Sequence, residues 1–313
     1  MTHTIENFRN AFGIAVRSAV PSTWKSASWL LRLMIPISLA VTLMQHGGLL
    51  EWIAGYLNPL FVHLGLSGSS AVVFMSGAMA GTYAGLAAMM VVPLTMKQAT
   101  ILSLMIALCH ALPMECAVNR KTGSSFWLMG LIRICMALLC ALGLNLLLPE
   151  WADDFVYLGA AAESSWQGVL LTWVVSQAKM ALMVFLIIYL LMVLQRLIEA
   201  YGLLRPLSEF LSPLMRLFGL PCKSAYMWLV GNVLGISYGS AVMLELEEKG
   251  IIDKREANEV NYHLIMNHSL LEDTIVFVLV GINGWLLVGV RIAFAILIVW
   301  ARRGLRYCFS PKK

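Results

Sequence analysis

Long apolar stretches run through this sequence and restrict what it can fold into. One of them, at positions 180–194, reads MALMVFLIIYLLMVL and carries no charged residue. A helix that crosses a membrane needs about 20 mainly apolar residues. The stretches do not alternate apolar with polar residues, which excludes a transmembrane β-barrel. Only 12% of the residues are charged, whereas a soluble domain carries about 25%. The sequence therefore predicts an all-α polytopic membrane protein.

The chain also contains two copies of one pattern, which begin at Leu49 and at Leu203. The matched pairs are Pro59/Pro213, Gly65/Gly219, Ser70/Ser224, Gly77/Gly231, Gly81/Gly235 and Gly85/Gly239. After a short insertion in the second copy, the match resumes at His110/His268, Trp127/Trp285 and Arg133/Arg291, with Glu115 opposite Asp273. Glycines, a histidine, an acid and an arginine in the same order indicate an internal repeat rather than chance.

Each copy predicts the same five elements. These are a long apolar helix (27–45 and 177–197), a proline-interrupted amphipathic segment (49–64 and 203–218), a glycine-rich apolar stretch (69–92 and 224–246), a further helix (97–118 and 255–280) and a last helix (125–148 and 285–302). We divide the chain into an amphipathic cytoplasmic segment (1–26), a first repeat (27–150), an extracytoplasmic acidic linker (151–176), a second repeat (177–303) and a basic cytoplasmic tail (304–313).

The distribution of charge predicts the topology. All of the 22 Lys and Arg residues except Lys97, Arg133, Lys179 and Arg291 lie on one side if each copy crosses the membrane three times. Basic residues favour the cytoplasmic side. The glycine-rich stretch must then enter and leave on the same side, as a re-entrant hairpin, unless the amphipathic segment also crosses. An odd number of crossings inverts the second copy, and inverted repeats with broken elements are a transporter architecture.

This order of elements resembles the core of concentrative nucleoside transporters. The stretch GNVLGISYGSAVMLELEEKG at 231–250, followed by a polar helix at 261–274, resembles the nucleoside-recognition, or Gate, domain. That domain also occurs in spore maturation proteins A and B and in ferrous iron transport protein B. The likeness in element order covers about residues 28–302. The chain departs from the GNAATP-type hairpin: Asn232 is followed by Val-Leu-Gly, and the first copy lacks the asparagine. The resemblance implies a transporter fold, with a nucleoside as one candidate solute.

Polar residues inside otherwise apolar helices predict a site. Ionisable groups in a membrane normally face a cavity or a partner, and Pro113 should break its helix. The cluster at the second copy and its counterpart in the first should therefore face each other near the bilayer midplane. The candidate substrate-binding or ion-binding residues are His110, Glu115, Asn267, His268, Ser269, Glu272, Asp273, Asn232, Ser237, Tyr238, Thr82 and Tyr83. The alternative is a structural network that locks the two copies together.

Two further sets of residues recur in both copies. Arg133 and Arg291 lie deep in the last helix of each copy, where an internal ion pair is expected, Arg133 with Glu115 and Arg291 with Asp273 or Glu272. The glycines Gly77, Gly81, Gly85, Gly231, Gly235 and Gly239 have the spacing of close helix packing. They also suit a tight hairpin tip whose backbone is open to a ligand.

Other chemistry is weakly indicated. Cys109, His110, Met114, Glu115 and Cys116 lie close together, but no ligand spacing is diagnostic of a metal, so the metal is unknown. The six cysteines form no CxxC pair and are read as reduced and mostly structural. Enzyme motifs such as GxSxG, HExxH and GxxxxGK are missing from the sequence, so no catalytic residue and no cofactor is predicted.

The sequence is compatible with three alternative functions. The first is transport of a small polar or anionic solute, coupled to H⁺ or Na⁺, where His110 and His268 suit a proton because histidine titrates near neutral pH. The second is a divalent metal permease, and the third is a membrane assembly factor. The expected partners are the solute and the lipid bilayer, with no nucleic acid, and a homo-oligomer is left open. The expected location is the inner (plasma) membrane, with both termini cytoplasmic.

Overall fold

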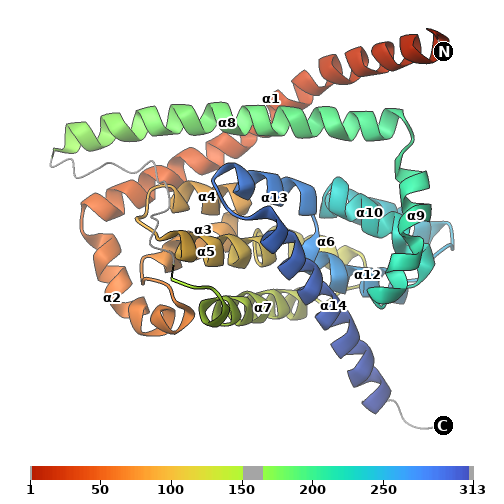
Figure 1. The fold of residues 1–313 in the computed structure, drawn as a ribbon. Coiled ribbons are helices and arrows are strands. Elements are labelled where there is room, and N and C mark those ends of the chain that lie inside the picture. The colour runs from red at the N-terminus through yellow and green to blue at the C-terminus, as the bar shows by residue number, and fades with distance from the viewer. Residues whose placement is uncertain (1, 151–164, 310–313) are drawn as a thin grey trace.

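The computed structural model describes residues 2–150 and 165–309, and every regular element in these ranges is a helix (Figure 1). The first half contains α1 (Thr2–His46), α2 (Leu49–Phe61), the 3-10 helix η1 (Val62–Leu64), α3 (Ser70–Ala80), α4 (Thr82–Met89), α5 (Met96–Leu108), α6 (Leu112–Lys121) and α7 (Phe126–Leu147). The second half contains α8 (Trp166–Ala200), α9 (Leu204–Leu217), η2 (Cys222–Ser224), α10 (Ala225–Val233), α11 (Ile236–Glu248), α12 (Lys254–Asn267), α13 (Leu270–Leu279) and α14 (Gly284–Phe309). The two halves therefore have the same order of elements.

Four segments of the described chain are long and apolar enough to cross a membrane. By length and composition they are Met96–Lys121, Phe126–Leu147, Trp166–Ala200 and Gly284–Tyr307. They coincide with four of the six predicted crossings and confirm the all-α polytopic class. In α1 the apolar part is shorter, at Ile35–Met44. The remaining predicted crossing, 255–280, is divided into α12 and α13, just as Met96–Lys121 is divided into α5 and α6.

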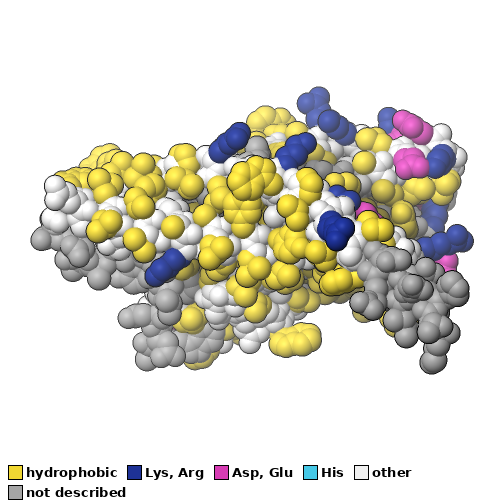
Figure 2. Space-filling model, turned by 90° about the horizontal axis from the view of Figure 1, so that it is seen from above, with side chains coloured by type: hydrophobic (Ala, Val, Ile, Leu, Met, Phe, Trp, Pro, Cys, Tyr) yellow, Lys and Arg dark blue, Asp and Glu magenta, His cyan; other side chains and the backbone are white. Residues whose placement is uncertain are grey.

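The long helices α1 and α8 run side by side along one face of the molecule (Figure 1). The rings of Trp24 and Phe185 pack at 5.5 Å, and Gln177 donates a hydrogen bond to the Ser38 hydroxyl at 2.8 Å. Hydrophobic side chains cover much of this face when it is seen from above (Figure 2). Because they are exposed on a chain of this composition, they form a surface suited to lipid.

Two predicted boundaries differ from the structure. Helix α1 is longer than the helix predicted at 27–45, because it continues without interruption through Pro21 and Pro36. The reason is tertiary: this part of α1 packs on α8, where Arg196 donates to the Ser22 hydroxyl at 2.9 Å. The helix α8 begins at Trp166, capped by Ser165, so it takes in the end of the predicted linker. Most of that linker, with Asp153, Asp154 and Glu163, lies outside the described residues.

The glycine-rich stretches form two helical hairpins, α3–α4 and α10–α11. Each turns at a glycine with a backbone that other residues rarely adopt, Gly81 at φ 112° and Gly235 at φ 90°. The arms then approach closely: a methyl group added at Gly85 would lie 3.0 Å from the Gly77 Cα, and one at Gly239 would lie 2.9 Å from the Gly231 Cα. Glycine is required at these positions because the two backbones touch.

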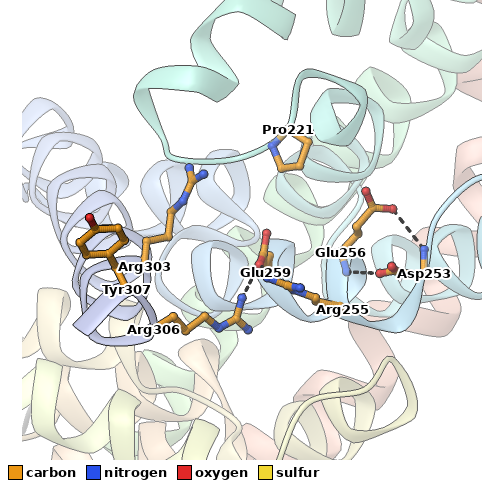
Figure 3. A pocket seen from close by; sticks show the side chains of 8 residues that line it. All are labelled: Pro221, Asp253, Arg255, Glu256, Glu259, Arg303, Arg306 and Tyr307. Carbon is orange, nitrogen blue, oxygen red and sulfur yellow. Dashed lines mark hydrogen bonds and ion pairs between the residues drawn. The ribbon is translucent and has the colours of Figure 1, made fainter. Parts of the chain in front are cut away.

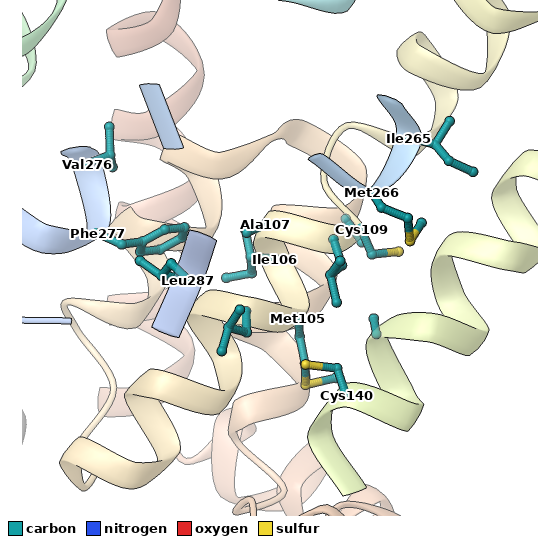
Figure 4. Close-up of a cluster of buried hydrophobic side chains, with 14 of the residues drawn as sticks. Met105, Ile106, Ala107, Cys109, Cys140, Ile265, Met266, Val276, Phe277 and Leu287 are labelled. Carbon is teal, nitrogen blue, oxygen red and sulfur yellow. The ribbon is translucent and has the colours of Figure 1, made fainter. Parts of the chain in front are cut away.

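The core lies between the two halves, around the nearly fully buried helix α5. Met105 and Ile106 of α5 are fully buried and belong to the same cluster as Met266 of α12 and Phe277 of α13 (Figure 4). Helix α5 also packs against α14 and α12 of the second half. The halves therefore share one apolar core, which holds their broken helices at fixed positions.

Candidate functional site

The site begins where one helix in each half is broken. Helix α5 ends before Cys109 and α6 starts after Ala111, whose φ is 45°; α12 ends before His268 and α13 starts after Ser269, whose φ is 52°. These are the two non-glycine residues with positive φ in the described chain. The Ala111 amide donates to the Gly77 carbonyl at 3.1 Å, and the Ser269 amide donates to the Gly231 carbonyl at 3.3 Å. Each break is therefore tied to the hairpin of its own half.

The first break precedes the residue that was expected to cause it. Pro113 lies in the first turn of α6, where its missing N–H is tolerated. In the second half Ser269 and Leu270 occupy the region that matches Ala111 and Leu112, and the chain breaks there without a proline. A proline is therefore not needed for such a break, and the hydrogen bond to the hairpin is the contact that both breaks share.

An arginine supports each break from the last helix of its half. Arg133 donates through Nε to the Leu108 carbonyl at 2.9 Å, and Arg291 donates to the Met266 carbonyl at 3.1 Å. These carbonyls lie at the ends of α5 and α12, where no helical N–H remains to bind them. The same arginines pair with the acid in the first turn of the following helix, Arg133 with Glu115 and Arg291 with Asp273. Both guanidinium groups are buried.

Two histidines from the two breaks meet at the centre. The Nε2 atoms of His110 and His268 are 3.1 Å apart. The Glu115 Oε1 atom lies 3.1 Å from the first and 3.0 Å from the second. All three side chains are buried. They form the one cluster of three potential metal-ligand groups found among the described residues.

The second acid, Asp273, does not join this cluster. Its Oδ2 atom is 3.0 Å from Arg291, and its Oδ1 atom accepts a hydrogen bond from Thr82 at 2.9 Å. Next to it, Glu272 accepts a hydrogen bond from the Tyr83 hydroxyl at 3.0 Å. Since Thr82 and Tyr83 begin α4, these bonds join the first hairpin to the broken helix of the second half. Glutamate on one side and the shorter aspartate on the other make the site asymmetric.

A cavity of about 1090 Å³ opens over these groups. Its lining residues from the hairpins and breaks are Gly81, Thr82, Tyr83, His110, Ala111, Met114, Glu115, Gly235, Ile236, Tyr238, His268, Ser269, Glu272 and Asp273. The long helices close it with Lys25 and Arg32 from α1 and with Gln195, Arg196 and Glu199 from α8. Both halves and both long helices therefore contribute to a single cavity.

Comparisons with known proteins agree with this architecture. The sequence model of the nucleoside recognition (Gate) family matches residues 27–124. A similar protein is the "Uncharacterized membrane protein YvoD" of Bacillus subtilis (strain 168), which is 30% identical over 279 residues, or 88% of this chain and 89% of that protein. The chain belongs to the Gate family of membrane proteins. No solved structure matches this Gate-family protein.

Two predicted site residues of the Gate-family protein, Asn267 and Asn232, do not line the cavity. Asn267 contacts His263 at 3.2 Å, and His263 accepts a hydrogen bond from the Trp228 indole at 2.9 Å. Asn232 donates to the Trp228 carbonyl at 2.9 Å. These groups form a buried polar network within the second half. The side chain of Ser237 lies outside the described part of the structure, so its predicted role stays a prediction.

Sequence reasoning also missed residues that line the cavity. The charge distribution predicted a cytoplasmic position for Lys25, Arg32 and Arg196, and the structure adds that all three line the cavity. Their helices α1 and α8 are neighbours only in the tertiary structure, so local sequence carried no signal for this. The structure does not bring the two nearby cysteines, Cys109 and Cys116, into the three-residue cluster, whereas Met114 lines the same cavity.

A second, more polar pocket of about 540 Å³ lies among the ends of α12 and α14 (Figure 3). Its charged groups neutralise one another: Arg306 binds Glu259 at 2.5 Å, and Glu256 binds Lys223 at 2.6 Å. Asp253 caps α12. We interpret this pocket as a network of ion pairs between helix ends, since its described acids are already paired or used as a cap.

Proposed function

We propose that this protein transports a small polar solute, with a nucleoside-like compound as one candidate. The observation that carries the proposal is the cavity of about 1090 Å³, where both hairpin tips and both helix breaks meet over buried ionisable groups. Its volume is slightly above the range of about 300–1,000 Å³ that is typical of small-molecule sites. A membrane assembly factor does not need such a cavity, so this alternative is less favoured.

The cavity offers recognition groups of both signs. The helices α4, α6, α11 and α13 start at its wall, next to Gly81, Ala111, Gly235 and Ser269. Amide groups at helix starts lack helical partners and favour hydrogen-bond acceptors. Lys25, Arg32 and Arg196 add positive charge, while Glu272 adds an acid. A solute with hydroxyl, carbonyl or carboxylate groups fits this set of donors and acceptors.

We further propose inverted repeats with re-entrant hairpins. The arms α3 and α4 have 11 and 8 residues; at about 1.5 Å per residue neither arm spans a hydrocarbon core of about 30 Å. A glycine turn between two short arms supports entry and exit on one side. With basic residues on the cytoplasmic side, both termini would be cytoplasmic in the inner membrane. Coupling to H⁺ or Na⁺ belongs to the same proposal.

The direct test is uptake by proteoliposomes that contain the purified protein. Labelled uridine, adenosine and succinate serve as neutral and anionic probes, with protein-free liposomes as the blank. We expect saturable uptake of at least one probe. The variant Tyr83→Phe frees Glu272 from its hydrogen bond. We expect it to lower uptake about tenfold, since a hydrogen bond to a charged group contributes about 1.5–3 kcal/mol.

The matched control is Tyr56→Phe, because Tyr56 is 71% exposed on α2 and does not line the cavity. It should transport like the unmodified protein. Equal uptake by Tyr83→Phe and Tyr56→Phe would contradict a solute site at this cavity.

Divalent metal transport is the second candidate function. It is favoured by the two histidines and Glu115, and metal-loaded vesicles test it in the same assay.

A further inference from the structure

We propose that His110, Glu115 and His268 bind one divalent transition-metal ion, with an open coordination position directed to the cavity. This inference goes beyond solute transport and does not depend on it. It rests on how the three groups are oriented, on the distances between them and on the contacts that hold them in place.

The orientation of the histidines leaves their lone pairs facing one another. His110 Nδ1 lies 3.1 Å from the Ile106 carbonyl, and His268 Nδ1 lies 2.8 Å from the Leu264 carbonyl. A carbonyl oxygen can only accept a hydrogen bond, so Nδ1 carries the proton in both rings. In the neutral rings, both Nε2 atoms are then acceptors. Together with the carboxylate of Glu115, three acceptors converge without a donor between them, and a cation at their centre resolves this conflict.

The distances match the size of a metal ion. The three potential ligand atoms, Nε2 of His110, Nε2 of His268 and Oε1 of Glu115, form a triangle with edges of 3.0, 3.1 and 3.1 Å. Zinc and similar ions lie about 2.0–2.1 Å from histidine nitrogen and carboxylate oxygen. An ion at that distance from all three atoms would sit about 1 Å out of their plane, with ligand–metal–ligand angles of about 97°, between the octahedral and the tetrahedral value. Little movement of the side chains is therefore needed.

Contacts outside the triangle already fix the ligands. The two backbone carbonyls hold the imidazole rings, and Arg133 binds the other carboxylate oxygen of Glu115. Such outer contacts orient ligands at metal sites and set the tautomer. Arg133 occupies Oε2 and leaves Oε1 toward the histidines. In the second half, both oxygens of Asp273 are occupied by Arg291 and Thr82, so one site is expected rather than two.

The ligand types select the class of metal. Two imidazoles and one carboxylate suit Zn²⁺, Fe²⁺, Co²⁺ or Mn²⁺, whereas Mg²⁺ and Ca²⁺ prefer all-oxygen sites. Three protein ligands leave a position free for water or solute. All three residues line the large cavity, so that position is accessible to a solute with a lone pair.

The test is metal binding by the full-length protein in detergent micelles. The protein is stripped with a chelator, titrated with Zn²⁺ or Co²⁺, desalted and measured by elemental mass spectrometry. We expect one ion per chain. X-ray absorption of the zinc-loaded protein should show two imidazole nitrogens and a carboxylate oxygen in the first shell. Failure of Zn²⁺, Co²⁺, Mn²⁺ and Fe²⁺ to bind above background would overturn the proposal, and so would a first shell that contains sulfur.

Ligand variants locate the ion. His268→Gln and Glu115→Gln should each weaken binding by at least about 100-fold, since loss of an outer contact alone costs 10–100-fold. His63→Gln is the matched control, because His63 is an exposed histidine outside the cluster. Unchanged affinity in both ligand variants, or equal loss in the control, would contradict this location. If a ligand variant fails to fold, the spectroscopy of the unmodified protein still decides. Binding without any uptake would contradict only the transport proposal.

Discussion

The close approach of the first hairpin to α5 predicts a packing defect that a second substitution repairs. A methyl group at Gly77 would lie 2.8 Å from Cγ1 and 3.0 Å from Cγ2 of Ile106. Carbon atoms pack best at about 3.5–4.0 Å, and Ile106 is fully buried. Overpacking of this kind costs about 1–3 kcal/mol, while alanine in a helix gains about 1 kcal/mol over glycine. Gly77→Ala should therefore lower the free energy of unfolding by up to about 2 kcal/mol.

The repair is Ile106→Ala, which removes the three atoms nearest to the new methyl group, Cγ1, Cγ2 and Cδ1 of Ile106. Alone, it should cost about 2–5 kcal/mol, because it leaves a cavity in the core. In the double variant the Gly77→Ala methyl group extends into the vacated space. We expect the double variant to be less destabilised than the sum of the two single variants by at least about 1 kcal/mol.

Unfolding in detergent can be followed with a thiol-reactive dye, because Cys109, Cys116 and Cys140 are buried and free. The control is Gly143→Ala in α7, where an added methyl group meets no atom within 4 Å. It should leave stability unchanged or raise it. Additive effects of Gly77→Ala and Ile106→Ala would refute the reasoning, because the two positions would then not be in contact.

Three further changes test other parts of the structure. Gly81→Ala should lower Tm although nearby atoms leave room for the methyl group, since a backbone at φ 112°, ψ 173° costs other residues about 1–3 kcal/mol; an unchanged Tm would mean that the turn can relax. Arg291→Met should cost about 3–5 kcal/mol by leaving the buried Asp273 carboxylate unpaired. Addition of Asp273→Asn should recover part of the lost stability, and no recovery would argue against the ion pair between Arg291 and Asp273. In intact cells, a cysteine at Lys121 should be shielded from an impermeant thiol reagent and one at Gly284 should react; labelling at Lys121 would contradict the re-entrant topology.

Much of the architecture could be predicted from the sequence. The apolar stretches predicted four of the segments that are long enough to cross a membrane, since chain length and hydropathy are local properties. The matched residues of the two copies also predicted where equivalent elements occur. Gly81 and Gly235 lie at the hairpin turns and His110 and His268 at the breaks, because a repeated sequence repeats its local backbone requirements.

Other features needed the tertiary structure. The continuity of α1 and the early start of α8 depend on how these helices pack on each other. The surroundings of Asn267 and Asn232 also needed the tertiary structure: a polar residue in an apolar helix can face either a cavity or a buried partner, and here both contact the network around Trp228 and His263. Helical periodicity does not distinguish the two environments.

The sequence by itself determined that this chain is a duplicated, helical membrane protein, and which residues are costly enough in an apolar setting to need partners. It also marked His110, Glu115 and His268 as members of one set. Only the tertiary structure decided which of the two matched acids, Glu115 or Asp273, lies beside the histidines. Glu115 reaches the two histidines, whereas Asp273, one methylene shorter, is held by Arg291 and Thr82. The physical reason is that distances of about 3 Å between residues far apart in the sequence depend on the packing of α5, α12 and the hairpins, and not on local composition.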